Sequence, residues 1–433
     1  MTSFTDTLKF VQSHALEQDE LELRTRLTAV EYEKMMRTEP MDNVLDTIVS
    51  HSLRSYYNNG QVVETPMKSD ETDVSHCKIF TKRQIERHTL GGIVVALSRE
   101  EDQANLEPNA NVTMSRTRNR TSHHYPRGIC VEITQVTSVT ELKMATSMEF
   151  EVEFRRDTTP DELLEVLWHY LPRAIYNVFT KSVTFIGNMP HSLTGKTVYN
   201  VNDYVYSHKL DGVRGLVLTT PFGALKIDRT MTTQKLIDNP FSKIAPWTLL
   251  DCEFMPNRTV VPFDVLYSAN QCVMGDSHQS RLKSVELAHS KSSVSEANVI
   301  DFKTFYAHPG LIPISDDVDG IIFTSKRDYF QIVYKHKWEP TIDLMWQDNG
   351  YVLSDGSRFD PMVSSPDHAR CNGHVYEFAW SSTEFIWKFV KERPDKKIAN
   401  ARKTVDNVME SIMNPVVIPS LGPFLPCVPV HGD

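Results

Sequence analysis

The residues best suited to chemistry lie in segment 209–214, which reads Lys-x-Asp-Gly-x-Arg. A neutral lysine amine such as that of Lys209 can attack the α-phosphate of a nucleotide and form a covalent intermediate. The Asp-Gly pair predicts a tight turn after a strand at 204–207, because glycine tolerates backbone angles that other residues resist. Such a turn returns Arg214 to the side of Lys209. A surface turn with ordinary solvated charges is the alternative interpretation of this string alone.

Charged residues downstream of Lys209 follow in an order that suits the same reaction. Neighbouring cations such as Arg214 would favour the neutral amine and bind a triphosphate. Carboxylates such as Glu253 would orient a sugar, or a Mg²⁺ ion that neutralises the leaving pyrophosphate. The further positions are Asp264, Asp319 in an Asp-Gly turn, Lys335 and Lys337 on one strand face, and a late cluster of Arg393, Asp395 and Lys396. Each position considered singly also fits a solvated strand or a plain turn.

In their order, these segments resemble motifs of the covalent nucleotidyltransferases, which comprise mRNA guanylyltransferases and ATP-dependent ligases. The resemblance covers motif I at 209–214, motif III at 251–254, motif IV at 319–323 and motif V at 334–338. It implies a nucleotidyltransferase domain followed by an OB-type domain. It also implies that Lys209 is the nucleophile, assisted by Arg214, and that GTP is bound by Asp211, Glu253, Asp319, Lys335, Lys337, Arg393, Asp395 and Lys396.

Two segments favour the guanylyltransferase branch of this family. Residues 185–193 resemble the stretch that precedes its motif I, and residues 393–400 resemble its motif VI. The chain departs from the family pattern at Cys252, which replaces a glycine, and at Ile186 and Ala399, which replace prolines. These departures leave the charged groups of the motifs in place.

A second candidate site is suggested by charged residues that alternate along segments near the N-terminus. They are Glu20 and Glu22, then Arg116, Arg118 and Arg120, and finally Glu149, Glu151 and Glu153. Period-two alternation puts each set on one face of a strand. Enclosed carboxylates repel one another, and Mg²⁺ or Mn²⁺ would relieve this because both take oxygen ligands. Inward-facing strands of this kind predict a barrel lined for a triphosphate, and a solvent-facing sheet with cross-strand ion pairs is the alternative.

The two glutamate strands resemble the signature of metal-dependent RNA triphosphatases of the triphosphate-tunnel type. The resemblance implies that Glu20, Glu22, Glu151 and Glu153 hold the metal, with Glu149 supporting catalysis. Arg116, Arg118 and Arg120 would bind the triphosphate. Glu132 and Thr134 match the family's strand that lies between the basic strand and the last glutamate strand. Candidates for the tunnel lining are Lys78, Lys82 and Arg83. A triphosphatase followed directly by a guanylyltransferase resembles the late-expression-factor-four family of baculoviruses and related large DNA viruses. That resemblance implies viral RNA polymerase subunits as partners and the host nucleus rather than the cytoplasm.

The elements that must position these residues predict an α+β multidomain chain. We expect an N-terminal antiparallel triphosphate-tunnel barrel at 1–168, a central α/β nucleotidyltransferase domain at 169–338 and an OB-type domain at 339–433. Patterning predicts strands at 204–208, 213–219, 249–254, 260–265, 320–324, 330–336, 351–353 and 374–379. It predicts a short helix at 161–170, a helical stretch at 383–413, loops at 60–75 and 99–112, an exposed helix or loop at 285–298 and an extended tail at 414–433.

Composition limits the class of protein. The 433 residues suggest two or three domains, and the net charge of −10 means that a nucleic-acid-binding surface would be local. The six cysteines form no Cys-x-x-Cys pair, which favours neither a disulfide framework nor a zinc site and fits a reducing compartment. We find no apolar run of the roughly 18 residues that a membrane span needs, and no signal-peptide pattern. An intracellular protein without a membrane partner is therefore expected.

Together these patterns predict a bifunctional mRNA capping enzyme that acts on GTP and on RNA with a 5′-triphosphate end. Two alternatives stay open at this stage. One is an RNA or DNA ligase that loads AMP onto Lys209, and the other is a non-catalytic subunit of a viral transcription complex. Retention of Lys209, Glu22 and Glu151 argues against the second alternative, since a lapsed enzyme need not keep them.

Overall fold

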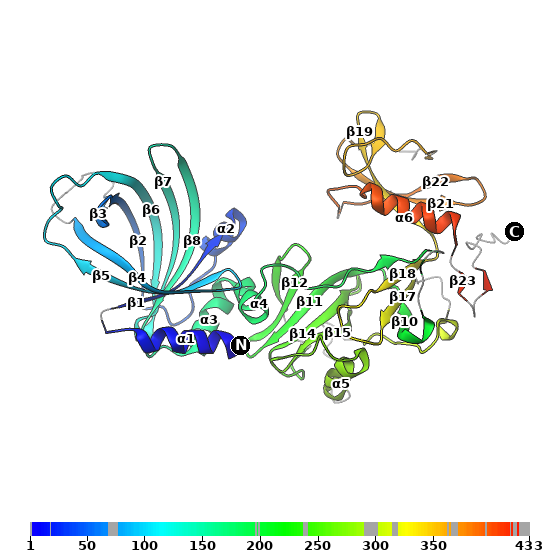
Figure 1. Ribbon diagram of the computed structural model, residues 1–433, viewed down its shortest axis with the longest axis horizontal. Helices are drawn as coiled ribbons and strands as arrows, with labels where there is room; N and C mark the ends of the chain where they lie inside the picture. The colour runs from blue at the N-terminus through cyan, green and yellow to red at the C-terminus, as the bar shows by residue number, and fades with distance from the viewer. Residues whose placement is uncertain are drawn as a thin grey trace. The chain divides into compact units, whose positions relative to one another are not determined.

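The chain divides into two units in the computed structural model (Figure 1). The structure describes residues 2–17, 19–67, 77–194, 197, 200–236, 241–289, 302–313, 319–361, 363–364, 371–394, 396–415, 417–418 and 422–423. The first unit comprises Met1–Ile186 and Val217–Trp247, and the second comprises Gly187–Leu216 and Thr248–Asp433.

Eight antiparallel strands of the first unit close into a barrel. Around the barrel, the order is β1 (Glu20–Leu27), β5 (Ile93–Asp102), β4 (Lys78–Leu90), β3 (Gln61–Pro66), β2 (Asp46–Tyr57), β6 (Val112–His124), β7 (Cys130–Val139) and β8 (Met144–Phe154). Pairing of β8 with β1 closes the ring, with Leu21 opposite Phe154 and Leu27 opposite Met148. Closure removes the free edges that an open sheet would expose.

Alternating residues give β1 an apolar outer face and a charged face toward the barrel interior. Leu21 and Leu23 of β1 are buried on one side of the strand, and the acidic residues between them occupy the other. Helices α1 (Thr2–His14), α2 (Ala29–Met36) and α4 (Pro172–Thr180) contact the barrel strands. Helix α3 (Pro160–Tyr170) begins with a capping box between Thr159 and Glu162 and packs on α1 and α4.

The remaining elements of the first unit are a short 3₁₀ turn at Pro126–Gly128 and the hairpin of β12 (Gly223–Asp228) and β13 (Thr233–Leu236). Strand β11 (Val213–Thr220) runs from residues of the second unit into residues of the first. This strand therefore connects the Lys-x-Asp-Gly-x-Arg segment to the hairpin along the chain.

Three groups of paired strands build most of the second unit. Strands β14 (Thr248–Phe254), β15 (Val260–Ser268) and β16 (Gln271–Cys272) pair in order, and α5 (His278–His289) packs on β15. A second sheet has the order β10 (Tyr204–His208), β17 (Gly320–Ser325), β18 (Tyr334–Lys337) and β9 (His191–Ser192), with β18 and β9 parallel. Short 3₁₀ turns lie at Val201–Asp203 and Pro309–Leu311.

The third sheet has the order β20 (Gly350–Val352), β19 (Thr341–Gln347), β21 (Val375–Ser381) and β22 (Ile386–Glu392). Helix α6 (Arg402–Met413) packs Val405 and Val408 against its core, which includes Phe378 and Trp387. Strands β23 (Val417–Ile418) and β24 (Gly422–Pro423) form a separate pair.

The structure confirms the antiparallel barrel and the helix expected at 161–170. It does not confirm an OB-type fold, because the described part of 339–433 is a four-stranded sheet with α6 and the small β23–β24 pair. The three-domain division stays a prediction. The strand expected at 330–336 is shorter and begins at Tyr334.

Three predictions of local structure need correction. In the loop expected at 60–75, residues 61–66 form β3 and residues 68–75 lie outside the described residues. The loop expected at 99–112 is confirmed for 103–111 only, because β5 extends to Asp102 and β6 begins at Val112. The helical stretch expected at 383–413 begins with β22, because Trp387 and Phe389 pair across to Trp380 and Phe378 of β21 and enter its core. Of the helix or loop expected at 285–298, residues 285–289 belong to α5 and the rest lies outside the described residues, as does most of the tail at 414–433. Within the described part of the chain, we find no helix with the length and apolar character needed to cross a membrane.

Candidate active sites

The acidic residues of three neighbouring strands meet inside the barrel. Pairing of β1 with β8 places Glu22 opposite Glu153. Pairing of β7 with β8 places Glu132 opposite Glu151 and Cys130 opposite Glu153. Register thus gathers the carboxylates that the sequence placed far apart along the chain.

Burial changes the protonation of this acidic cluster. Glu22 is fully buried, and burial together with the neighbouring Glu151 raises its pKa to about 9. Burial, reinforced by Glu132 and Glu20, raises the pKa of Glu153 to about 8. Burial also acts to raise the pKa of Glu151, but its contacts with Glu22, Arg118 and Lys82 outweigh this effect and lower it. A cation bound among these carboxylates would favour their charged forms and lower the raised pKa values of Glu22 and Glu153.

Basic side chains line the barrel interior beside these acids. Lys82 Nζ lies 2.5 Å from Glu20 Oε2 and 3.8 Å from Glu22 Oε2. Arg120 Nη1 lies 2.5 Å from Glu132 Oε1, and Arg118 Nη2 lies 3.9 Å from Glu151 Oε2. Arg118 is only 6% exposed, and burial lowers its pKa. A polyanion that enters the lumen would find these guanidinium groups next to the carboxylates.

The other predicted barrel residues lie near the ends of this charged stripe. Glu149 is opposite Arg26 and Thr134 by register and accepts a 3.3 Å hydrogen bond from Ser147. Arg116 stacks on Tyr56, with its guanidinium carbon 5.3 Å from the ring centre. Both residues therefore lie on the same strand faces as the central cluster.

Buried carboxylate oxygens test whether this site suits a divalent metal. Neither oxygen of Glu22 accepts a hydrogen bond from any described residue, although Arg24 Nη1 forms an ion pair with Oε1 at 3.0 Å. Glu132 Oε2 likewise has no donor among the described residues. Buried oxygens of this kind fit a hard cation such as Mg²⁺ or Mn²⁺, which takes oxygen ligands. Among the described residues, the group with ligand atoms close enough for one cation contains Glu132 and Glu153, and metal binding by Glu20, Glu22 and Glu151 stays a prediction.

The second site surrounds Lys209, which follows β10. The Lys209 amide donates a 2.7 Å hydrogen bond to the Gly320 carbonyl, and the Lys209 ammonium pairs with the Asp319 carboxylate. Gly320 has φ +147°, and a Cβ at this position would lie 2.0 Å from the His336 carbonyl oxygen. Only glycine allows β17 and β18 to approach this closely and thereby hold Asp319 next to Lys209.

Two lysines of β18 extend this cluster. Lys337 Nζ lies 3.6 Å from Asp319 Oδ2 and donates a 2.7 Å hydrogen bond to Thr341. Burial lowers the pKa of Lys335, and the charges of Lys337 and Lys209 lower it further. The structure therefore gathers the cations that the sequence placed around Lys209.

Glu253 and Lys303 complete this side of the cluster. A Cβ on Gly212 would lie 2.7 Å from Glu253 Cγ, so the turn requires glycine for this close approach. Burial raises the pKa of Glu253, with Lys303 and Lys209 opposing. Burial lowers the pKa of Lys303 to about 8, with Glu253 opposing. Lys303 was not predicted; its position between Phe302 and Phe305 is the signal that could have indicated a lysine held against an apolar surface.

Arg214 is held by a network of its own. Its Nε and Nη2 atoms bind Asp251 at 2.9 and 2.6 Å, and Nη1 donates to the Asn188 carbonyl at 2.6 Å. Tyr329 donates a further 2.6 Å hydrogen bond to Asp251, which is fully buried. Arg214 thus joins β11 to β14, while Asp211 is exposed at the turn. Sequence reasoning did not identify the supporting roles of Asn188 and Tyr329.

Asp264 belongs to a buried ion pair that supports this network. Arg281 of α5 binds both of its carboxylate oxygens, at 2.7 and 2.8 Å, and is 1% exposed. The same guanidinium lies 5.7 Å from the ring centre of Tyr329. Asp264 therefore positions α5 and Tyr329 and does not face Lys209 as a free carboxylate.

We expect Arg281→Ala to destabilise the second unit by about 3–5 kcal/mol, because it leaves the Asp264 carboxylate buried without its partner. Urea unfolding of the full chain measures this loss. Arg327→Ala is the matched control, since Arg327 pairs with Asp203 at 3.9 Å on the surface and should leave the unfolding midpoint nearly unchanged. Equal midpoints for both variants would contradict the supporting role of Arg281.

The predicted C-terminal cluster is paired within its own sheet. Arg393 Nη1 lies 3.3 Å from both Asp343 and Glu377, and the Lys396 ammonium binds Asp343. Lys337 Nζ lies 3.8 Å from Glu377, so it connects this cluster to Asp319. Asp395, the third predicted residue of the cluster, lies outside the described residues.

Residues 297–421 match the family described as mRNA capping enzyme, C-terminal domain. The matched range includes Asp319, Lys335, Lys337 and the paired cations Arg393 and Lys396. Lys209 lies outside this range, but its side chain contacts Asp319 within it. The match therefore covers much of the charged surroundings of Lys209.

Similarities to solved structures are more distant. The S. pombe Pct1 RNA triphosphatase is 13% identical to this chain, with a TM-score of 0.31. The match covers 41% of this chain and 91% of the S. pombe chain. The mimivirus capping enzyme triphosphatase is 13% identical, with a TM-score of 0.28. That match covers 42% of this chain and 96% of the mimivirus chain. A mycobacterial DNA ligase D, solved with ATP and MES, is 15% identical, with a TM-score of 0.33. That match covers 49% of this chain and 96% of the ligase chain. No curated protein matches the sequence.

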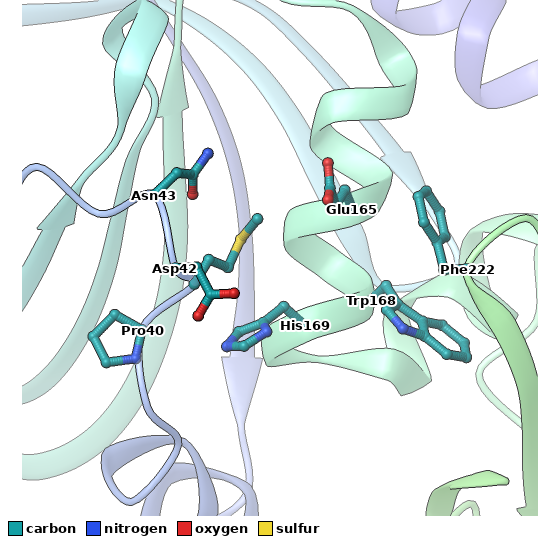
Figure 2. Close-up of a pocket in the computed structure, with 8 residues that line it drawn as sticks. Pro40, Asp42, Asn43, Glu165, Trp168, His169 and Phe222 are labelled. Carbon is teal, nitrogen blue, oxygen red and sulfur yellow. The ribbon is translucent and has the colours of Figure 1, made fainter. Parts of the chain in front are cut away.

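A separate cavity of about 430 Å³ lies in the first unit (Figure 2). It is lined by Pro40, Met41, Asp42, Asn43, Glu165, Trp168, His169 and Phe222. None of these lining residues belongs to the charged barrel interior or to the Lys209 cluster. We therefore assign neither proposed reaction to this cavity.

Proposed function

We propose that this chain is a bifunctional mRNA capping enzyme. The observation that carries the proposal is that the capping-enzyme match at 297–421 supplies Asp319, Lys335 and Lys337 around Lys209. The charged barrel in the same chain supports the second proposed activity, which is triphosphatase activity. The barrel would remove the γ-phosphate from a 5′-triphosphate RNA end, and Lys209 would add GMP to the resulting diphosphate end.

Guanylyl transfer requires Lys209 to leave its ion pair with Asp319 and attack the α-phosphate of GTP as a neutral amine. A nitrogen–phosphorus bond forms, the bond to the β-phosphate oxygen breaks, and pyrophosphate leaves. Lys335 and Lys337 would stabilise the departing negative charge. The β-phosphate of the RNA end would then displace GMP from Lys209 and form the cap.

In the barrel, Arg118 and Arg120 would hold the triphosphate while the acidic cluster faces the γ-phosphate. Glu20, Glu22, Glu151 and Glu153 would hold Mg²⁺ or Mn²⁺, which supplies Lewis-acid stabilisation of the phosphate charge. Glu149 would orient the attacking water from its place on the same face of β8. The full burial of Glu22 supports this proposal, because charges attract more strongly where water is excluded.

Incubation with labelled GTP or labelled ATP, followed by denaturing electrophoresis, tests this function. A GMP adduct that transfers to diphosphate-ended RNA is the expected result. An AMP adduct would instead support the RNA or DNA ligase alternative. A chain that forms neither adduct and releases no γ-phosphate would be a non-catalytic subunit with this fold.

We expect Lys396→Ala to impair adduct formation from GTP at least about tenfold more than GMP transfer from the preformed adduct. Lys396 and Arg393 must leave their ion pairs with Asp343 before they can bind pyrophosphate. Pyrophosphate leaves in the first half-reaction and is absent from the second, so the two steps should differ. Both half-reactions are measured in the same variant, with adduct trapped at high GTP before RNA is added. Lys397→Ala, at the neighbouring exposed lysine, is the control. Equal losses in the two steps would contradict this role.

We further propose, from the resemblance to late-expression-factor-four proteins, that viral RNA polymerase subunits are partners and that the host nucleus is the site of action. Copurification of polymerase subunits with the tagged chain from infected nuclei tests both points. Recovery of the chain alone, from the cytoplasm, would contradict them.

A further inference from the structure

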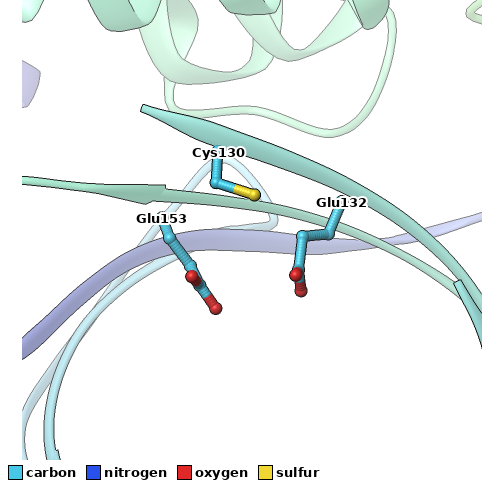
Figure 3. A group of neighbouring side chains, drawn as sticks. All are labelled: Cys130, Glu132 and Glu153. Atoms are coloured by element: carbon cyan, nitrogen blue, oxygen red, sulfur yellow. The ribbon is translucent and has the colours of Figure 1, made fainter. Parts of the chain in front are cut away.

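A thiol lies among the carboxylates of the barrel interior. Cys130 is the first residue of β7, Glu132 follows on the same strand face, and Glu153 of β8 is paired opposite Cys130. One ligand atom from each of the three residues lies within 4.8 Å of the other two (Figure 3). This arrangement joins a soft sulfur donor to two hard oxygen donors.

The Glu132 carboxylate provides an independent indication of a ligand. The residue is only 4% exposed, and Arg120 engages its Oε1 atom. Its Oε2 atom has no hydrogen-bond partner in the part of the chain that the structure describes. Figure 3 shows the carboxyl groups of Glu132 and Glu153 projecting side by side near the Cys130 thiol. A buried carboxylate oxygen without a donor is well suited to a cation.

A histidine lies on the other side of the thiol. His124 of β6 is paired opposite Cys130, and its Nε2 atom is 4.0 Å from Sγ. Zinc prefers four ligands and bonds sulfur at about 2.3 Å and nitrogen or oxygen at about 2.0 Å. The ligand atoms of Cys130, Glu132 and Glu153 lie within 4.8 Å of one another and must draw together by roughly 1 Å to meet these bond lengths. His124 lies outside that group, so its imidazole must rotate further to reach the same cation.

We propose that Cys130, Glu132 and Glu153 bind a divalent cation of the zinc class, with His124 as a fourth donor. Thiolate and imidazole ligands favour zinc over Mg²⁺ and Mn²⁺, which prefer oxygen. As the metal–sulfur bond forms, the thiol proton is released to solvent. Because Glu132 and Glu153 also belong to the acidic cluster of the proposed triphosphatase, zinc bound here withdraws both carboxylates from the Mg²⁺ or Mn²⁺ site and inhibits hydrolysis; this consequence rests on the proposed function.

Titration of the metal-free full chain with Cd²⁺ alone tests the site through the ultraviolet absorption of the cadmium–thiolate bond. In Cys130→Ser, the highest-affinity Cd²⁺-binding step that produces this absorption should disappear. Cys252→Ser, which removes another buried thiol, should keep it and is the matched control. Glu132→Gln leaves the thiol intact and should weaken the step more than about tenfold. Circular dichroism verifies the fold of each variant. A Cys130→Ser titration identical to that of the unmodified chain, or an unchanged step in folded Glu132→Gln, would overturn the proposal.

A second measurement separates this inference from the proposed function. Micromolar Zn²⁺ added to Mg²⁺-supported γ-phosphate release should inhibit the unmodified chain more strongly than Cys130→Ser. If triphosphate RNA is not hydrolysed at all, the proposed triphosphatase fails while the Cd²⁺ step still reports the site. If hydrolysis proceeds and the Cd²⁺ step is absent, the metal site fails and the triphosphatase stands.

Discussion

Lys209→Ala should abolish the covalent GMP adduct, with a loss on the order of 10⁶-fold that places it below detection. The amine is the only atom of this side chain that can form the bond to phosphorus, so nothing else in the residue can compensate. Labelled GTP followed by denaturing electrophoresis measures the adduct. Release of γ-phosphate from triphosphate RNA should persist in the same variant, because the barrel belongs to the other unit.

Two further variants separate the nucleophile from its charge. Lys209→Arg keeps a cation for the Asp319 carboxylate but cannot supply a neutral amine, since a guanidinium stays protonated. It should therefore fold normally and still form no adduct. Lys326→Ala removes a lysine whose Nζ binds the Asn202 carbonyl at 2.8 Å, and it should leave the adduct at its normal level. An adduct that persists in Lys209→Ala would contradict the assignment of Lys209 as the nucleophile.

Glu22→Gln and Glu151→Gln should each reduce γ-phosphate release about 10²- to 10³-fold in the presence of Mg²⁺ or Mn²⁺. Each change keeps the size of the side chain and removes one negative charge from the buried cluster. Loss of that charge weakens the binding of the cation that stabilises the phosphate. Phosphate release from γ-labelled RNA provides the measurement, and formation of the GMP adduct should be unaffected.

The matched control for these variants is Glu101→Gln. Glu101 is an exposed glutamate on β5 of the same barrel, so its substitution tests the loss of a carboxylate outside the interior. Near-normal hydrolysis by both Glu22→Gln and Glu151→Gln would show that the acidic cluster is structural. Raising the metal concentration should partly restore the two interior variants but should not change Glu101→Gln.

The sequence alone was enough to predict the alternating faces of β1 and β8, because period-two alternation follows from the pleat of a single strand. The helix at Pro160–Tyr170 was predictable because its capping box and its proline at the first position are also local. The change of direction after Lys209 was predicted for a different reason from the one found: Gly212 does not take a positive φ, and it is required because Glu253 approaches it closely.

Local patterns were insufficient where long-range pairing competes with them. Segment 386–392 alternates weakly beside a helical run, and its partner β21 decides that it is a strand by burying Trp387. The position of Lys303 next to Glu253 likewise depends on packing between segments 50 residues apart. No pattern within either segment contains that information.

Tertiary structure also decided which charged residues share a site. The alternation of Glu20 and Glu22 is compatible with a solvated sheet or with a lumen, and closure of β1 against β5 and β8 selects the lumen. The same closure brings Cys130 and Glu132 to Glu153. Arg214 follows Lys209 in sequence, yet its guanidinium binds Asp251. A side chain's partner is set by the strand that packs against it, and strand packing is a property of the whole fold.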